Sequence, residues 1–326
     1  GAVPQAPKPG VVPLRPLGLG EILDGSISYV RRDPRTVLGI SAVLSMVIAV
    51  VQTLAVAVAG GSFFSLLGDP TFGTSVTDPS DLVGPIAGLA TAGLVAGLVT
   101  FVLQIVATGM LTVVMSRAVL GRRVSSREAW ERVKPQFWRL IGVTLLVGLV
   151  VGGAGTLGIA LAFGLGGLIE AAGGSGLGIV LGFLLVLGTV VLVAWLVIRY
   201  LLAPAVLVLE RSGPVAAMRR SSLLVKGAWW RTFGIYLLAT ILVSIVAQVL
   251  SFPLSFVVGL LPVFGDASML ALVFAITTGL TTLITTMITL PFTSGVVALL
   301  YIDRRIRREA LDIELQRAAA GAGPAQ

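Results

Sequence analysis

The amino-acid sequence predicts an all-α polytopic membrane protein with six transmembrane helices as three repeated hairpins, each preceded by a cytoplasmic amphipathic elbow helix. Three observations predict this class. The 326 residues are 56% hydrophobic and only 12% charged, whereas soluble domains carry about 25% charged residues. Several apolar runs exceed the roughly 18 residues that mark a spanning helix. The basic residues fall on alternate sides of these runs.

The distribution of charge predicts the topology. All 23 lysines and arginines lie before the first run, between the second and third, from the end of the fourth to the start of the fifth, or after the sixth. Because short loops rich in lysine and arginine stay in the cytoplasm, both termini are expected in the cytoplasm. The protein itself is expected to be a multi-pass protein of the cytoplasmic (inner) cell membrane. The other connections lie at roughly 60–85, 170–176 and 262–268. Their charged residues are all acidic: Asp69, Asp78, Asp81, Glu170 and Asp266.

The same charge asymmetry bears on the partners. A net charge of +8 could indicate a nucleic acid, but the positive-inside pattern accounts for it, so we expect no nucleic-acid partner. Anionic lipid of the inner leaflet would meet the basic surface. The excess of arginine over lysine is typical of a high-GC genome and so favours a bacterial source of that kind.

Composition also excludes several chemistries. The chain has no cysteine and no histidine, so it lacks thiolate catalysis, the commonest general base and the commonest metal ligand. The Gly-rich stretch from Gly164 to Gly178 has no lysine or hydroxyl in phosphate-loop order. Asp78, Asp81 and Glu170 are expected to be solvated caps. We therefore predict that the chain is not an enzyme and binds no metal and no cofactor.

The segments follow in order along the chain. Residues 1–18 are expected to form a Pro-rich flexible cytoplasmic tail. Residues 303–326 are expected to form a cytoplasmic charged helix and a disordered tail, with solvated pairs such as Asp303/Arg307 and Arg305/Glu309. The six-helix membrane domain covers 19–302, with spans at about 37–59, 86–115, 140–168, 177–209, 233–261 and 269–302.

The even-numbered spans are longer than a membrane requires. They run about 30 residues, whereas roughly 20 suffice. Such helices either tilt or continue past a break, and Pro204 and Pro291 are the candidate breaks because proline lacks a backbone N–H. We favour long even-numbered helices that project into the cytoplasm.

An internal repeat supports the hairpin organisation. Residues 133–142 align without gaps on residues 225–234, and a weaker copy at 32–39 precedes the first span. The elbow helices begin with a capping box of Ser125 and Glu128 or with Pro214 in a first turn. Such short basic amphipathic helices are expected at the membrane interface. The repeat units are about 19–115, 118–209 and 211–302.

Polar residues within the spans could converge on a cavity. The last span carries threonines at spacings of three and four, and three other spans carry one glutamine each, which would be costly facing lipid. The threonines could instead pack against a neighbouring helix or return hydrogen bonds to their own backbone, and we favour packing. The candidate polar cavity consists of Gln52, Gln104, Gln248, Thr278, Thr282, Thr285 and Thr289, with Thr293 continuing the stripe.

A second candidate set lies where the elbows meet the membrane. Tryptophan and arginine are typical of the headgroup region. Arg199 is the one basic residue within an apolar stretch, and we favour snorkelling to the interface over an intramembrane functional charge. The candidate interface residues are Trp138, Arg139, Arg199, Trp229, Trp230 and Arg231.

Glycines four residues apart form a further pattern. They occur at Gly93/Gly97, at Gly148/Gly152 and at Gly174/Gly178/Gly182. Small residues at this spacing let helices approach closely. We expect packing within the chain rather than dimerisation.

The first elbow carries a family resemblance. Residues 13–25 (Pro-Leu-Arg-Pro-Leu-Gly-Leu-Gly-Glu-Ile-Leu-Asp-Gly), followed by Tyr29 and Arg31-Arg32, resemble actinobacterial integral membrane proteins similar to the membrane domain of glycerophosphoryl diester phosphodiesterases. The resemblance extends over nearly the whole chain. It implies a six-helix membrane module that could be a partner for an enzyme or a transport machine. It does not imply the phosphodiesterase activity, which belongs in that family to a separate His-dependent barrel.

The leading functional hypothesis is a non-enzymatic integral membrane protein that acts as a scaffold or accessory subunit of a membrane-associated complex. Its cytoplasmic elbows and tails would bind protein partners whose identity the sequence does not give. The alternative hypothesis is a transporter or channel for a small solute or lipid through the Thr/Gln-lined cavity.

Overall fold

The computed structural model describes residues 11–13, 15–67, 83–174, 176–260 and 267–309, and the regular elements within them are all helical. This confirms the predicted all-α class. Within these described ranges, six helices are long and apolar enough to cross a membrane. They are α2 (Pro34–Leu67), α4 (Val83–Val119), α6 (Phe137–Ala171), α7 (Leu177–Tyr200), α10 (Trp229–Leu260) and α11 (Ala267–Glu309). The acidic residues Asp69, Asp78, Asp81 and Asp266, and the part of the predicted C-terminal segment 303–326 that follows residue 309, lie outside the described residues.

Short helices precede three of the long ones, as the elbow prediction requires. They are α1 (Leu19–Arg32), α5 (Ser126–Val133) with the 3-10 turn Lys134–Gln136, and α9 (Pro214–Val225). The Ser125 side chain accepts the Glu128 N–H at 3.2 Å and so caps α5. Pro214 opens α9 in its first turn, where a missing N–H costs nothing. The internal repeat itself stays a prediction.

The two prolines predicted as breaks behave differently. The helix is interrupted after α7, and a new helix, α8 (Ala203–Glu210), begins with Pro204 in its first turn. Pro291 instead lies inside α11, which is unbroken, so the predicted break there is wrong. The Tyr29 hydroxyl of α1 donates to the Pro291 carbonyl and so joins α1 to α11 at this position. Burial raises the pKa of Tyr29 above its ordinary value, so the hydroxyl stays protonated.

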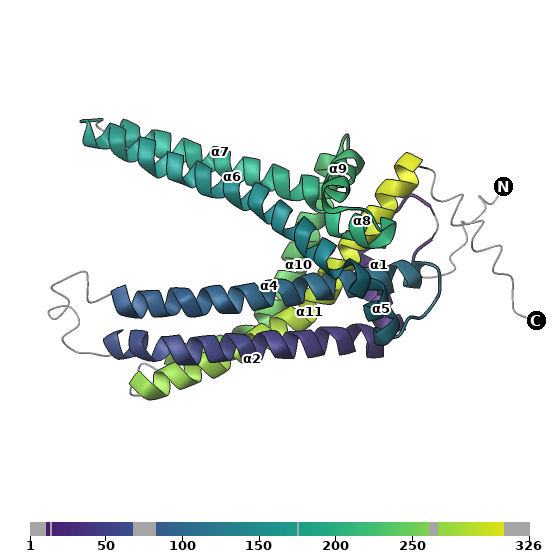
Figure 1. Cartoon of the computed structure of the whole chain (residues 1–326), viewed down its shortest axis with the longest axis horizontal. Helices are drawn as coiled ribbons and strands as arrows, with labels where there is room; N and C mark the ends of the chain where they lie inside the picture. The colour runs from purple at the N-terminus through teal and green to yellow at the C-terminus, as the bar shows by residue number, and fades with distance from the viewer. Residues whose placement is uncertain (1–10, 14, 68–82, 175, 261–266, 310–326) are drawn as a thin grey trace, which may run out of the picture.

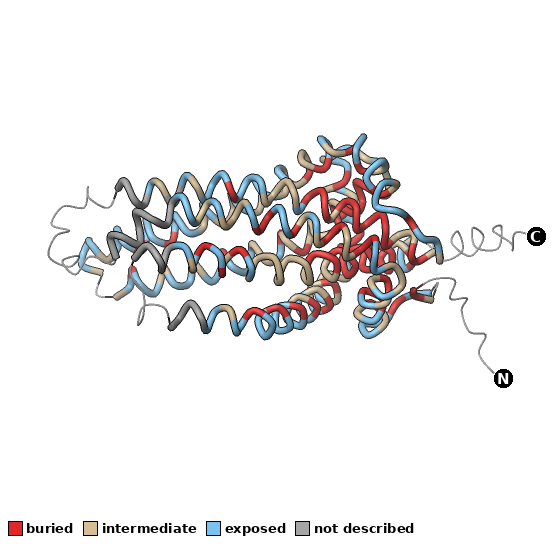
Figure 2. Tube along the Cα trace, turned by 90° about the horizontal axis from the view of Figure 1, so that it is seen from below, coloured by how far each residue is buried: buried red, intermediate tan, exposed pale blue. Residues whose placement is uncertain are grey.

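The buried core lies at one end of the molecule, where the short helices and the C-terminal part of α11 gather (Figures 1 and 2). We call this end the hub. The N-terminal segment belongs to it, because Val11, Val12 and Leu17 are buried. Val12 lies so close to Gly25 of α1 that a Cβ at Gly25 would stand 2.6 Å from it. The predicted flexible tail over 1–18 is therefore wrong for the described part of that stretch.

The α6–α7 hairpin diverges from the other long helices (Figure 1). In the most apolar stretch of each span, 56% of the residues are buried in the α4 span but 6% in the α6 and α7 spans. The hairpin meets the rest of the chain near the hub, where Leu140 packs on Gly109 and Gly142 on Pro214. We call this hairpin the arm.

Candidate functional site

The structure does not gather the seven predicted cavity residues around one pocket among those described here. Gln104 and Gln248 are exposed on α4 and α10, and Gln52 is half-buried on α2. Along α11, the half-buried residues of the set are Thr278, Thr282, Thr285 and Thr289. The hydroxyls of Thr285 and Thr289 donate to the carbonyls of Thr281 and Thr285, each at 2.8 Å, which is the local bonding expected of threonine in an apolar helix.

Gln104 alone of the seven lines a described pocket, where α4, α6 and α8 meet at the base of the arm. The pocket has a volume of about 140 Å³ and is also lined by Thr108, Thr144 and Pro204. The Thr144 hydroxyl donates to the Leu140 carbonyl at 2.9 Å. The remaining space accommodates a few water molecules.

The predicted interface residues divide into exposed and packed side chains. Trp138 and Trp230 are 79% and 78% exposed, and Arg139 is exposed as well. Trp229 stacks on Phe233 with ring centroids 5.0 Å apart, and its indole N–H donates to the Trp195 carbonyl at 3.3 Å.

Arg199 lies in the last turn of α7, at the hub end of the arm. Its guanidinium carbon stands 4.7 Å from the centre of the Trp195 ring, within cation–π range. The Ser221 hydroxyl of α9 donates to the Arg199 carbonyl at 2.9 Å. Arg199 and Trp229 therefore help to join the arm to α9 and α10.

Arg231 belongs to a cluster around the buried carboxylate of Asp303. The Asp303 side chain is 0% exposed and accepts hydrogen bonds from the Leu17 N–H at 2.9 Å and from Arg307 Nε at 2.8 Å. Arg231 pairs with it at 3.4 Å. The Leu17 carbonyl accepts from both guanidinium groups, at 2.6 and 3.0 Å. The prediction of a solvated Asp303/Arg307 pair is wrong, because the N-terminal segment covers it.

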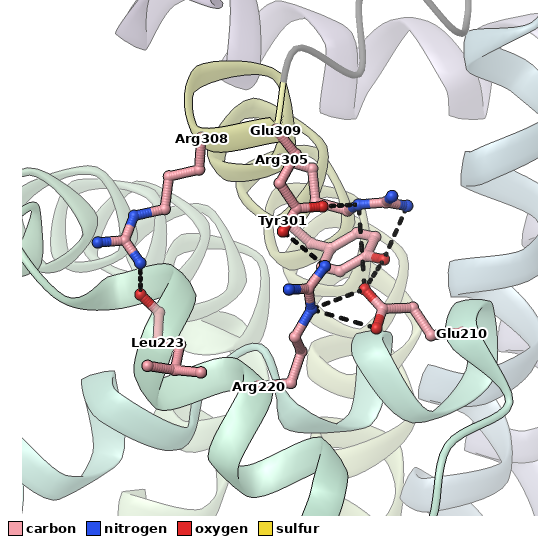
Figure 3. Close-up of polar contacts among 7 residues, drawn as sticks. All are labelled: Glu210, Arg220, Leu223, Tyr301, Arg305, Arg308 and Glu309. Carbon is pink, nitrogen blue, oxygen red and sulfur yellow. Dashed lines mark hydrogen bonds and ion pairs between the residues drawn. The ribbon is translucent and has the colours of Figure 1, made fainter.

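A second ionic cluster joins α8, α9 and α11 (Figure 3). The Tyr301 hydroxyl donates to Glu210 at 2.7 Å. Arg220 pairs with Glu210 at 3.3 Å and with Glu309 at 2.5 Å. Arg305 pairs with Glu309 at 2.9 Å, so the predicted pair forms but as part of a larger network.

A third set of contacts fixes the end of α9. Arg304 Nε donates to the Leu224 carbonyl at 2.9 Å, and Arg308 donates to the Leu223 carbonyl (Figure 3). The last carbonyls of a helix lack partners within it, and cations there are favourable. The spacing of four residues is a signal in the sequence for the pairs 303/307 and 305/309 within α11, but it does not identify the α9 carbonyls that Arg304 and Arg308 contact.

The glycines of the arm are used in two different ways. At Gly178 an added Cβ would lie 2.1 Å from the Gly166 carbonyl oxygen, so these glycines pack α6 against α7 as predicted. At Gly148 and Gly152 no described neighbour lies within 4 Å of an added Cβ, and both positions are exposed. This pair on α6 faces outward, and so does the Gly93/Gly97 pair on α4, both contrary to the expected intrachain packing.

Comparison with protein families gives a match over most of the chain. A family model described as a domain of unknown function (DUF7847) matches residues 56–303, a range that contains the whole arm and most of the hub. Comparisons with curated proteins and with solved structures found no match. Among the described residues, no three side chains of histidine, cysteine, aspartate or glutamate gather where they could hold a metal ion.

Proposed function

We propose that this chain, which belongs to the DUF7847 family of unknown function and is a multi-pass membrane protein, acts as a non-enzymatic scaffold or accessory subunit of a membrane-associated complex. In the part of the chain that the structure describes, the lysines and arginines lie in the hub or in the first and last turns of helices that end at the hub. The positive-inside rule then assigns the hub and both termini to the cytoplasmic side of the inner cell membrane.

The observation that carries this proposal is the unpartnered glycine pair on the arm. Gly148 and Gly152 stand one helical turn apart on an exposed, otherwise apolar helix. Lipid contact requires no small residues, whereas close helix–helix packing in a membrane favours them. The partner that fits this face is an apolar transmembrane helix of another protein.

In this proposal, any catalytic activity of the complex belongs to the partner protein. The chain itself contains no histidine and no cysteine. The resemblance of residues 13–25 to the actinobacterial proteins and phosphodiesterase membrane domains supports an enzyme or a transport machine as the partner. Lipid contact remains general, through the basic hub and the anionic leaflet.

Replacing Gly148 and Gly152 with leucine is expected to lower partner recovery about tenfold, because the larger side chains separate the two helices. The measurement is affinity purification of the full chain from native membranes with quantitative mass spectrometry. Folding should be unaffected, since the added side chains enter open space. Gly164→Leu is the matched control, because this α6 glycine is also open and lies on another face of the helix.

Two results would contradict the proposal. Equal recovery by the double variant and the wild type would show that this face binds no partner. Purification of a second copy of the chain alone, lost in the double variant, would reassign the face to self-association.

The alternative function is transport of a small solute or lipid, favoured by the Gln104 pocket between the arm and α4. Thr285→Leu and Gln248→Met, combined in one chain, should leave partner recovery unchanged if the chain is a scaffold. A transporter that uses the predicted cavity should instead lose flux, measured by solute release from proteoliposomes. Gln104→Leu tests the pocket in the same assay.

A further inference from the structure

A compact cationic pocket lies in the hub, where α4 ends and the 3-10 turn meets α8. Its volume is about 190 Å³, and its lining includes the guanidinium-bearing residues Arg117, Arg132 and Arg211. Val113 and Leu209 form apolar parts of the wall. The pocket is thus cationic and apolar at once, and it lies at the end of a membrane-spanning helix.

The three arginines are only partly neutralised. Arg132 pairs with Glu128 at 2.8 Å. Arg117 and Arg211 make no ion pair with an acid among the described residues. The carboxylate next to Arg211 in the chain, Glu210, is engaged by Arg220 and Tyr301. Two uncompensated guanidinium groups beside one small pocket favour an anion.

The conformation of Arg211 points the same way. It follows α8 with φ of 52°, the one described non-glycine residue in the left-handed region. This region is unfavourable for a residue with a Cβ. Glycine is the residue that usually ends a helix in this conformation, so the arginine is kept at a local conformational cost.

Gln136 adds a second requirement for the ligand. It lines the pocket and is 6% exposed. Its Nε2 donates to the carbonyls of Arg132 and Val208, at 3.4 and 3.5 Å, but its buried Oε1 has no hydrogen-bond donor among the described residues. A buried acceptor without a donor is costly, and a hydroxyl on the ligand would satisfy it.

We propose that this pocket binds a phosphate group that carries an adjacent hydroxyl, as in the headgroup of a hydroxylated anionic phospholipid. The arginines bind the phosphate oxygens, and Gln136 Oε1 accepts the hydroxyl. The pocket lies at headgroup depth if α4 spans the membrane, so the lipid source rests on the proposed topology. A soluble phosphate offers the same chemistry and is the other source.

The charge requirement is tested by measuring lipid binding to the full chain in neutral detergent, with native mass spectrometry as the readout. The probe is phosphatidylglycerol in mixed micelles with phosphatidylcholine. Arg117→Gln and Arg211→Gln should each weaken binding about tenfold. Arg219→Gln is the matched control, because Arg219 is exposed on α9 outside the pocket, and it should change binding less than about twofold.

The hydroxyl requirement is tested by a second lipid, phosphatidylmethanol, which has the same charge and no headgroup hydroxyl. The wild type should prefer phosphatidylglycerol about fivefold, the effect of one added hydrogen bond. Gln136→Leu should bind the two lipids equally while retaining phosphatidylmethanol. Thermal unfolding of each variant checks that the hub remains folded.

Glycerol phosphate at millimolar concentration, which has both the phosphate and the hydroxyl but no acyl chains, distinguishes the two sources. Displacement of phosphatidylglycerol supports a soluble phosphate, and persistence of the lipid supports a headgroup. Equal losses in Arg117→Gln, Arg211→Gln and Arg219→Gln would overturn the proposal, because they would indicate diffuse surface charge. Unchanged binding in the first two variants would overturn it as well. Neither result bears on partner recovery through Gly148 and Gly152, which tests the scaffold separately.

Discussion

Asp303→Ala is expected to lower the free energy of unfolding by about 3 kcal/mol and to release the N-terminal segment from the hub. The carboxylate is fully buried and bridges Leu17, Arg307 and Arg231. Its removal leaves two guanidinium groups without their acid. This loss of unfolding free energy is at the lower end of what breaking a buried ion pair costs. The reason is that Arg231 and Arg307 stay 35% and 32% exposed, so water can solvate them in part.

The measurements are thermal unfolding in detergent and hydrogen exchange of the Leu17 amide, which donates to Asp303 in the folded chain. Glu131→Ala is the control, since Glu131 pairs with Arg127 at 3.1 Å on an exposed face and should cost less than about 1 kcal/mol. Equal effects of the two substitutions would mean that the Asp303 cluster does not hold the N-terminal segment. Asp303→Asn should fall between them, because the amide can still accept the Leu17 N–H.

The spans and elbow helices could be predicted because their signals are local. Hydropathy over about 20 residues reports whether a helix can cross the hydrocarbon, and the basic flanks separate one hairpin from the next. The S-x-x-E motif of Ser125 and Glu128 likewise predicts the start of α5 from four residues. The Ser125 cap forms, while the Glu128 carboxylate pairs with Arg132 instead. None of these features needs a distant partner.

The hub could not be predicted for the opposite reason. Asp303 reads as solvated in a charged helix, and its burial depends on Leu17, which is 286 residues away in the chain. Pro204 and Pro291 each have an apolar residue on either side. The structure nevertheless places Pro204 in the first turn of a new helix, α8, and Pro291 inside the unbroken α11.

The glycines show the same dependence on tertiary context. Gly148/Gly152 and Gly178/Gly182 share one spacing, yet the first pair is open and the second is packed. Spacing creates a flat helix face, and the position of the neighbouring helix decides whether that face is used. The polar-cavity prediction was subject to this limit too, because convergence of side chains from several helices is a tertiary property.

Gly178→Ala is expected to destabilise the arm by about 3 kcal/mol, at the upper end of the usual cost of overpacking. The added Cβ would lie 2.1 Å from the Gly166 carbonyl oxygen and 2.8 Å from the Glu170 nitrogen. Both are backbone atoms, so no side-chain rotation relieves the contact and the two helices must move apart. Gly188→Ala on the same helix enters open space and should leave stability within about 0.5 kcal/mol.

Because the chain has no native cysteine, the separation can be measured directly with paired spin labels at Leu161→Cys and Leu187→Cys, two exposed positions on α6 and α7. The labels should move apart in Gly178→Ala and keep the wild-type distance in Gly188→Ala. Thermal unfolding in detergent gives the matching energies. An unchanged distance and stability in Gly178→Ala would mean that the arm tolerates a Cβ at its tightest contact, and that its two helices are not held by the glycine face.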